Sequence, residues 1–280
     1  MSSAPVMSIA LARHLVAAHE TLHVEGMRAA AALEGNPFEI EVRRFGRASA
    51  AISRKVPLVE WYNRVVGLEH LDARTLREIL AFYRAHGIRG RFEIGPAELT
   101  SALAVTLASE RVGLERFESL LYAPIDARVA PPSSAVEVRP SPLSELDHYL
   151  EIWARGFALP EFLWPDVKRI RAAWFTVPEF HRYVALADGA PVACSALYVH
   201  GDVGYLCMSA TLPEARGRGA QSALIAQRVA DAGKLGCTFV VVETAEATPA
   251  KPAPSYRNTT RLGFQVAYLR PNFVKVLREA

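Results

Sequence analysis

The most informative segment of the sequence is Tyr205–Ala232, which reads YLCMSATLPEARGRGAQSALIAQRVADA. An apolar run with the composition of a buried strand leads into a loop that contains Arg216–Gly219, and an amphipathic segment, Ala220–Ala232, follows at once. Glycines let backbone N–H groups turn toward one point, and a helix N-terminus adds free donors and the positive end of its dipole. The order of strand, glycine-rich loop and helix therefore predicts a phosphate-binding site, to which Arg216 and Arg218 add positive charge.

The spacing of these glycines excludes two common phosphate-binding motifs. It fits neither the Gly-x-Gly-x-x-Gly fingerprint of dinucleotide-binding folds nor the Gly-x-x-x-x-Gly-Lys loop of nucleoside triphosphatases. Instead, Arg216–Gln221 resembles the R/Q-x-x-G-x-G/A signature of the GNAT superfamily of acetyl-CoA-dependent N-acetyltransferases, with Gln221 in place of the final Gly or Ala. In that family the strand before the loop separates from its neighbour and pairs with the pantetheine arm of the coenzyme.

The resemblance implies a set of coenzyme-binding residues. Backbone groups of Ala210, Thr211 and Leu212 take the place of those that pair with pantetheine. The pyrophosphate is expected on the loop and the first helical turn, at Arg216, Gly217, Arg218, Gly219, Ala220, Gln221 and Ser222.

A second part of the resemblance lies downstream, in Ser255–Phe264, SYRNTTRLGF, which is similar to the last helix of the family and its Gly-Phe ending. Ser255 and Asn258 are three residues apart, so they share a helical face, and they resemble the positions whose side chains touch the coenzyme. The resemblance covers about Val136–Leu277. It implies an N-acetyltransferase that uses acetyl-CoA as co-substrate, needs no metal, and transfers an acetyl or other short acyl group to a primary amine by direct attack in a ternary complex.

The chemistry of acyl transfer suggests two catalytic residues. A neutral amine must attack the thioester, and the departing thiolate needs a proton. Glu243 follows the apolar strand that ends at Val242, where strand ends open on a cleft, so we expect it to be the base. The tyrosine that the family places four residues before the Gly-Phe glycine is Thr259 here, and Tyr256, one turn earlier, is the candidate general acid. A packing role for Tyr256 stays open.

The chain is expected to hold two domains. The segment Ala123–Ala135, APIDARVAPPSSA, is rich in Pro and Ser and is typical of a linker. It separates residues 1–122 from a catalytic domain over residues 136–280. The sequence around Arg111-Val112-Gly113 echoes that around Arg261-Leu262-Gly263, which predicts two copies of one fold. The predicted class is α+β: tandem GNAT-like domains, each a mixed, mostly antiparallel twisted sheet flanked by helices.

Local patterns predict the elements of both halves. In the first half we expect helices at 7–33, 73–85 and 96–111 and strands at 38–42, 48–52, 62–68, 89–94 and 117–122. In the second half we expect helices at 142–157, 165–175, 220–232 and 255–262 and strands at 136–138, 181–187, 191–200, 203–208, 238–243, 264–269 and 273–277. The first half has no Arg-Gly-x-Gly loop, because Glu69-His70-Leu71 runs directly into a helix. It is predicted to be a degenerate copy that does not bind the coenzyme.

A rival motif occurs in the first half. His19-Glu20-Thr21-Leu22-His23 matches HExxH, the helix that carries two zinc ligands in metallopeptidases. The extended pattern requires a third histidine at the position of Ala29, so a zinc peptidase is the more remote alternative. We expect instead that His19 and His23 are exposed on a helix.

Composition limits the partners. The 280 residues carry a net charge of only +3, without the clustered basic stripe that nucleic-acid binding requires. No apolar run is long enough for a membrane span, and Cys194, Cys207 and Cys237 lie in apolar runs typical of buried thiols, so we expect a cytoplasmic protein. Aromatic residues between Trp153 and Phe180 favour a small-molecule amine acceptor in an apolar pocket. A homodimer and a non-catalytic, coenzyme A-binding regulatory protein remain as alternatives.

Overall fold

The computed structural model describes residues 7–126, 136–250 and 252–275. They form two compact units that are interleaved along the chain. Unit 1 comprises Met1–Leu22 and Ser119–Ala267, and unit 2 comprises His23–Glu118 and Tyr268–Ala280. The predicted domains, in contrast, are consecutive segments, and residues 127–135 of the predicted linker lie outside the described residues. Three elements contribute residues to both units: α1 (Ile9–Ala31), β5 (Val112–Pro124) and β11 (Gln265–Lys275).

The sheet of unit 1 has the strand order β5-β10-β9-β8-β7-β6. Its remaining strands are β6 (Glu137–Pro140), β7 (Phe180–Ala187), β8 (Ala190–His200), β9 (Val203–Thr211) and β10 (Phe239–Ala245). The pairs β6–β7, β7–β8 and β8–β9 are antiparallel, and β9–β10 is parallel. Asp188 and Gly189, with φ of 52° and 77°, make the predicted tight turn between β7 and β8.

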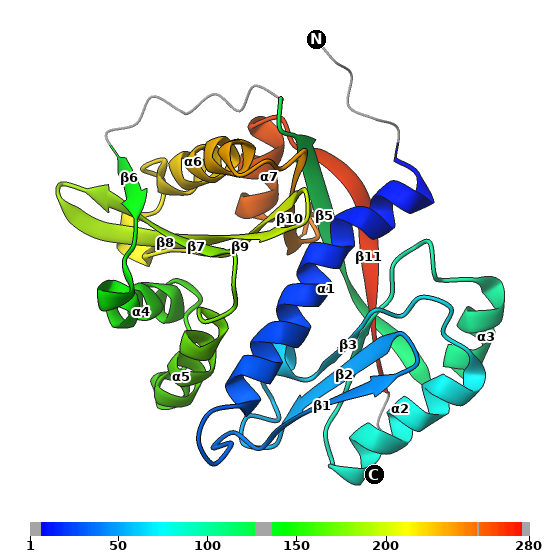
Figure 1. Ribbon diagram of the computed structural model, residues 1–280. Helices are drawn as coiled ribbons and strands as arrows, with labels where there is room; N and C mark the ends of the chain where they lie inside the picture. Colours follow the sequence, from blue (N-terminus) through cyan, green and yellow to red (C-terminus); the bar gives the residue numbers. More distant parts are fainter. Residues whose placement is uncertain (1–6, 127–135, 251, 276–280) are drawn as a thin grey trace. The chain divides into compact units, whose positions relative to one another are not determined.

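Helices cover both faces of this sheet. Helix α6 (Ala220–Lys234) lies on one face, and α4 (Leu146–Gly156) and α5 (Trp164–Trp174) lie on the other (Figure 1). Leu206 and Val240 belong to the core cluster that also contains Leu224 and Ile225 of α6. Because successive side chains of a strand alternate between the faces, Tyr205 points to the face opposite α6.

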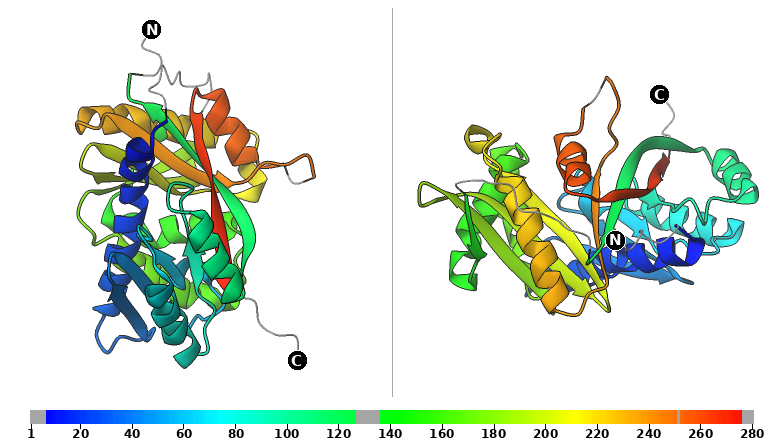
Figure 2. Two further views of the ribbon diagram at one scale, coloured as in Figure 1. Left: turned by 90° about the vertical axis from the view of Figure 1, so that its right-hand side faces the viewer. Right: turned by 90° about the horizontal axis from the view of Figure 1, so that it is seen from above.

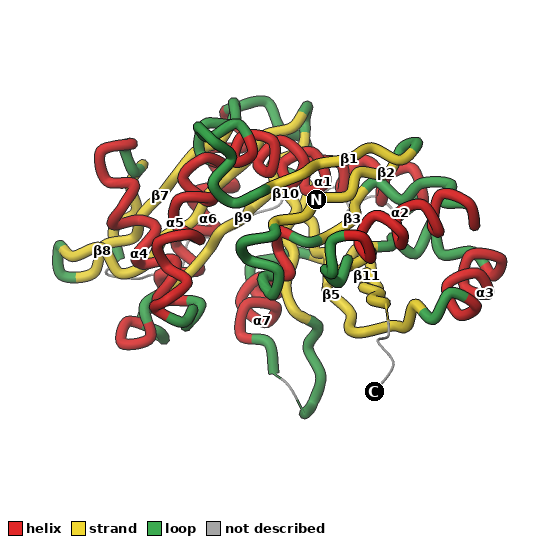
Figure 3. Tube along the Cα trace, turned by 90° about the horizontal axis from the view of Figure 1, so that it is seen from below, coloured by secondary structure: helices red, strands yellow, loops and turns green. Residues whose placement is uncertain are grey.

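Helix α7 (Pro254–Arg261) completes unit 1. After β10 the chain leads away from α7 before it returns to that helix, as far as the described residues of this connection show in Figures 2 and 3. Gly263 follows the helix with φ of 93°, which is the left-handed conformation expected of a C′ glycine.

The sheet of unit 2 has the strand order β1-β2-β3-β4-β11-β5. Its first four strands are β1 (Ile40–Phe45), β2 (Ala48–Ser53), β3 (Arg64–Val66) and β4 (Arg91–Glu93), and its helices are α2 (Ala73–Ala85) and α3 (Ser101–Ser109). The pair β3–β4 is parallel, whereas β1–β2, β2–β3 and β4–β11 are antiparallel. Each unit is thus a mixed, mostly antiparallel sheet with helices, which confirms the predicted α+β class.

Helix α2 begins and ends where the sequence predicts. The carboxylate of Asp72 accepts a hydrogen bond from the Thr75 amide at 2.7 Å, as an N-cap residue does. At the other end His86 is the C-cap, and Gly87 has φ of 65°. The apolar face of α2, including Leu76 and Ile79, is fully buried against the sheet of unit 2.

The predicted bounds of one helix are wrong, and so is the predicted division of one strand into two. The helix predicted at 96–111 covers only Ser101–Ser109, because Thr100 caps it by accepting from the Leu103 amide at 3.2 Å. Arg111, with φ of 53°, makes the turn after it, and Gly113 already lies in β5. The strands predicted at 264–269 and 273–277 form the single strand β11, in which Pro271 lacks a donor but accepts from the Ile94 amide at 3.3 Å.

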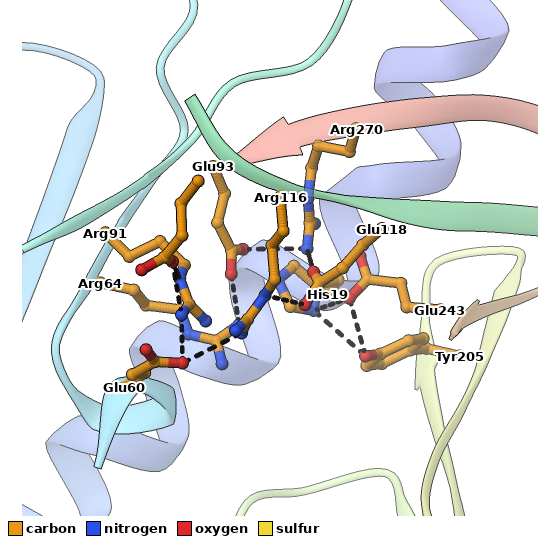
Figure 4. Close-up of polar contacts among 11 residues, drawn as sticks. His19, Glu60, Arg64, Arg91, Glu93, Arg116, Glu118, Tyr205, Glu243 and Arg270 are labelled. Carbon is orange, nitrogen blue, oxygen red and sulfur yellow. Dashed lines mark hydrogen bonds and ion pairs between the residues drawn. The ribbon is translucent and has the colours of Figure 1, made fainter. Parts of the chain in front are cut away.

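A cluster of ion pairs lies inside unit 2 (Figure 4). Glu93 on β4 accepts from Arg64 at 2.6 Å and lies 3.4 Å from Arg270, whose guanidinium also contacts Glu118 at 2.5 Å. Arg91 pairs with Glu60 and Glu115. Arg64, Arg91, Glu93 and Arg270 are buried, so each of these charges depends on its partner to offset the loss of water.

Of the helices in the described residues, none combines the length and the apolar composition needed to cross a membrane. The three cysteines are free and buried, as predicted. Burial raises the pKa of the Cys207 thiol to about 12 and holds that of Cys194 well above its ordinary value, so both thiols pack as small apolar groups.

Candidate active site

Strands β9 and β10 part in the middle of unit 1. Their parallel ladder joins Val203–Leu206 to Phe239–Val242. Beyond it β9 continues to Thr211 on the side of β8, where Thr211 pairs with Ala193. Glu243 is the first residue of β10 after the last pair, so its carboxylate stands at the point where the two strands separate.

A β-bulge lies in β9 just past this point. Between the pairs Ala196–Cys207 and Cys194–Ala210, β9 has one residue more than β8, and Met208 takes φ of 49°. The guanidinium of Arg228, from α6, donates from Nη1 to the carbonyls of Ala196 (2.9 Å) and Cys207 (3.4 Å) beneath the bulge. Burial lowers the pKa of Arg228 to about 10, which leaves it charged at neutral pH. Arg228 thus fixes the path of β9 beyond the bulge.

The end of β9 presents one set of backbone groups to the opening. The Leu212 amide donates to the Val192 carbonyl at 2.9 Å, so this amide bonds to the β8 side. Because alternate residues of an antiparallel strand face opposite edges, the N–H and C=O of Thr211 point away from β8. Of the predicted positions Ala210, Thr211 and Leu212, Thr211 is therefore the one whose backbone groups point toward the opening.

Gly156, at the end of α4, lies against this stretch. A Cβ atom at residue 156 would lie 2.7 Å from the Ala210 Cβ and 3.2 Å from both N and O of Thr211. Arg216, from the glycine-rich loop, donates from Nη2 to the Gly156 carbonyl at 2.9 Å. The predicted phosphate-binding charge of Arg216 is thus engaged in joining the loop to α4.

The loop itself opens directly onto α6. Gly217 and Gly219 have φ of 81° and 87°, a conformation that side chains other than glycine rarely adopt. Gly219 is the N-cap of α6, and no side chain caps the helix there. Arg218 is exposed and lies 3.6 Å from the exposed Asp188. An anion could bind here. It would accept hydrogen bonds from the N–H groups of the first helical turn, at Ala220, Gln221 and Ser222, and pair with the charge of Arg218.

The structure brings Gln221, Ser255 and Asn258 together. Gln221 Nε2 donates to Ser255 Oγ at 3.0 Å, and Asn258 Nδ2 donates to Gln221 Oε1 at 2.7 Å. The side chain that departs from the family signature therefore links α6 to the predicted polar face of α7.

His19, Tyr205 and Glu243 form a constellation in unit 1 (Figure 4). His19 Nδ1 lies 3.1 Å from Tyr205 Oη and 3.3 Å from Glu243 Oε2, and Tyr205 Oη donates to Glu243 Oε2 at 3.5 Å. The side chains of His19 and Glu243 are only 7% and 12% exposed. Sequence reasoning missed Tyr205. The parallel register Val241–Tyr205 explains the contact, because Glu243 shares a face with Val241.

Two predictions about histidine are therefore wrong. His19 and His23 are buried, with exposures of 6% and 2%, rather than exposed on a helix. A helical pattern shows which residues share a face, but not whether another part of the chain covers that face. Within the described ranges, no group of three or more His, Cys, Asp or Glu side chains is placed to hold a metal ion. The peptidase alternative thus lacks the third ligand that a zinc site needs.

Other predicted residues belong to the core. Tyr256 is half-buried and packs against the core cluster of unit 1, and Thr259 is buried. Among the aromatic residues predicted to line an acceptor pocket, Trp153, Trp174, Phe175 and Phe180 are buried in unit 1, whereas Phe157 and Phe162 are 44% and 80% exposed. Most of this aromatic density serves packing.

Comparison with known proteins agrees with the geometry. Residues 146–257 match the model of the acetyltransferase (GNAT) family. The matched residues include the parted strands and the loop, so this part of the chain is similar to the GNAT acetyltransferase family. No curated protein matches the sequence.

Solved structures extend the likeness to nearly the whole chain. A GCN5-related N-acetyltransferase from Kribbella flavida has 17% identity and a TM-score of 0.60 over 91% of this chain and 96% of that one. A tandem GNAT protein from the clavulanic acid biosynthesis pathway has 12% identity and a TM-score of 0.59 over 94% of each chain. A GCN5-related N-acetyltransferase from Sphaerobacter thermophilus has 13% identity and a TM-score of 0.60 over 92% and 91%. The chain therefore has the tandem GNAT fold, as the sequence resemblance predicts.

Proposed function

We propose that unit 1 transfers an acetyl or other short acyl group from acyl-CoA to a primary amine of a small molecule. One observation carries the proposal: two parallel strands part at Leu206 and Val242, and the strand that continues leads into a glycine loop before an uncapped helix N-terminus. The pyrophosphate would lie on the amides of Gly217–Ser222 beside Arg218. The pantetheine arm would pair with the backbone of Thr211.

The corresponding turn of unit 2 lacks these features. Asp72 already caps α2 by accepting from the Thr75 amide, and its negative charge stands where a phosphate would lie. Glu69 adds a second carboxylate, paired with Arg47 at 3.2 Å. These two carboxylates would repel a phosphate. They support a single coenzyme site, in unit 1, and a unit 2 that has lost its own.

The constellation around Glu243 supplies the proton transfers. Its carboxylate would accept a proton from the substrate ammonium, directly or through water. The amine nitrogen would then bond to the thioester carbonyl carbon, the C–S bond would break, and the proton that the nitrogen loses as the amide forms would pass to the departing thiolate. Tyr205 Oη, 3.5 Å from Glu243 Oε2, would relay that proton, whereas Tyr256 packs against the core. His19 would hold the carboxylate and the hydroxyl in place.

Two measurements test the proposal on the full chain. Calorimetry with coenzyme A tests the site, with Gly217→Val as the variant and Gly201→Val as its control. Both glycines have positive φ, and neither has any atom within 4 Å of an added Cβ, but Gly201 lies in the β8–β9 turn. We expect Gly217→Val to weaken coenzyme binding at least 10-fold and Gly201→Val to leave it unchanged.

Thiol release from acetyl-CoA across a panel of small primary amines tests the chemistry. We expect at least one amine to raise the rate well above hydrolysis. Coenzyme binding with background thiol release for every amine would favour the non-catalytic, regulatory alternative. Equal coenzyme affinity in both glycine variants would overturn the assigned site.

A further inference from the structure

Unit 2 contains a cavity that the proposed function does not use. It has a volume of about 680 Å³, within the range of small-molecule sites. Apolar parts of its lining come from Leu80 and Tyr83 on α2, Ile88 in the following turn, and Phe92 on β4. These residues lie at the C-terminal end of α2, away from the Asp72 cap that begins the helix.

The cavity is also lined by cations. Arg84, Arg89, Arg111 and Lys275 contribute to its wall, and none of its described lining residues is acidic. Lys275 donates to the main-chain carbonyl of Glu110, which is a neutral partner.

The four cations that line the cavity differ from most other cations of unit 2, because they have no carboxylate partner among the described residues. Of the sixteen Lys and Arg residues that the structure describes in unit 2, eleven have a carboxylate within 4.0 Å. The cations there without such a partner are Arg44, Arg84, Arg89, Arg111 and Lys275, and all but Arg44 line the cavity. Four of the five described cations of unit 2 without a carboxylate partner thus lie around this one cavity with its apolar residues.

The backbone conformation contributes to the same feature. Arg111 holds φ of 53° in the turn after α3, whereas the corresponding turn after α7 uses Gly263 at 93°. A left-handed conformation costs a residue with a side chain free energy that glycine avoids. The fold nevertheless carries an arginine there, at the wall of the cavity.

Close packing fixes the apolar side of the cavity. The Tyr83 ring lies directly on Gly90, where an added Cβ would come within 2.5 Å of it, and Tyr83 Oη donates to the Ala51 carbonyl at 2.9 Å. The ring is therefore held in place before a ligand arrives, which lowers the entropic cost of binding.

We propose that this cavity binds a small organic anion with an apolar body and a carboxylate or phosphate head. The apolar residues would bury the body, and Arg84, Arg89, Arg111 and Lys275 would pair with the head. The site lies wholly in unit 2 and is independent of acyl transfer in unit 1.

The test compares 4-phenylbutyrate with its neutral isostere 4-phenylbutanamide, and 4-phenylbutyl phosphate with inorganic phosphate, by calorimetry on the full chain. We expect both organic anions to bind at least 10-fold more tightly than the amide, and inorganic phosphate to bind weakly because it lacks the body. The variant Arg84→Gln/Arg111→Gln should lose this preference. Arg44→Gln, which removes the unpaired cation outside the cavity, should keep it.

Thermal melting of each variant checks that it folds, and Arg84 and Arg111 are exposed, so their replacement should leave the melting temperature unchanged. Binding of neither organic anion, equal affinity for anion and amide, or equal loss in Arg44→Gln would each overturn the proposal.

Discussion

The imidazole Nδ1 of His19 lies 3.3 Å from Glu243 Oε2. The first helix of the chain thereby contributes a side chain to the strand end that bears the proposed base. In the sequence this histidine stands in an HExxH motif, which suggests zinc, but in the structure its partners are a carboxylate and a tyrosine hydroxyl.

The first prediction concerns this pair. General acid–base catalysis contributes about 10²–10⁴-fold to a rate. Glu243→Gln should therefore lower kcat at least about 100-fold. His19→Asn should lower kcat by a smaller factor, with the KM for acetyl-CoA unchanged.

His14→Asn is the matched control, because His14 lies on the same helix and pairs with the exposed Asp202 at 2.7 Å. Its activity should equal that of the unmodified protein. A kcat in His19→Asn equal to that of the unmodified protein would show that His19 does not position the carboxylate and the hydroxyl for the reaction.

The second prediction concerns Gly156. In Gly156→Ala the new methyl group would meet the Ala210 Cβ and the backbone of Thr211, so α4 and the end of β9 must move apart. Overpacking of this kind costs about 1–3 kcal/mol. We expect a lower melting temperature and a raised KM for acetyl-CoA. Arg155→Ala, which removes an exposed pair with Glu214, should change both values little. An unchanged KM in Gly156→Ala would show that the packing of Gly156 against the end of β9 does not affect coenzyme binding.

The third prediction concerns Arg228. Arg228→Met keeps much of the side-chain volume but leaves the Ala196 and Cys207 carbonyls without their donor beneath the bulge. Each buried acceptor left unsatisfied costs about 1–3 kcal/mol. Urea denaturation should show reduced stability, and coenzyme affinity should fall because the bulge directs the end of β9. Full stability in Arg228→Met would contradict the role assigned to this guanidinium.

The fourth prediction concerns acid. Burial alone would raise the pKa of Glu118, but the charges of Arg270 and Arg64 and the side-chain amide of Asn272 together outweigh it and hold the pKa below its ordinary value of 4.5. A carboxylate with a lowered pKa contributes stability that is present above pH 4.5 and is lost as the pH falls below it. Glu60 follows the same rule beside Arg91 and Arg116. Unit 2 should therefore lose stability below about pH 4.5.

Glu118→Gln checks this cause. Its urea midpoint should be lower than that of the unmodified protein at pH 7, and the two midpoints should converge as the pH falls toward 3. A constant difference between the two proteins over that range would mean that the Glu118 charge does not contribute.

Local signals predicted what depends on neighbours in sequence. The Asp72 cap, the Asp188-Gly189 turn and the glycine loop before α6 each follow from the conformational needs of a few adjacent residues, and the structure places them as expected. The GNAT resemblance correctly indicated the fold.

Contacts between distant segments could not be read in this way. The partners of His19 depend on where β9 and β10 lie beside α1. The turn after α3 is made by Arg111, but the sequence pattern favours the nearby Gly113 as the residue that ends the helix. The aromatic residues after Trp153 show the same limit, since composition does not distinguish a pocket wall from a core.

The interleaving of the units has a consequence for synthesis of the protein. Unit 1 includes residues of α1, and unit 2 includes the last strand residues that the structure describes, so neither unit is complete until nearly all of the described residues have been translated. A chain cut between residues 126 and 136 would leave each fragment without a segment that belongs to its own core. The two units are thus expected to be expressed and inherited together, and neither is expected to fold as a separate fragment.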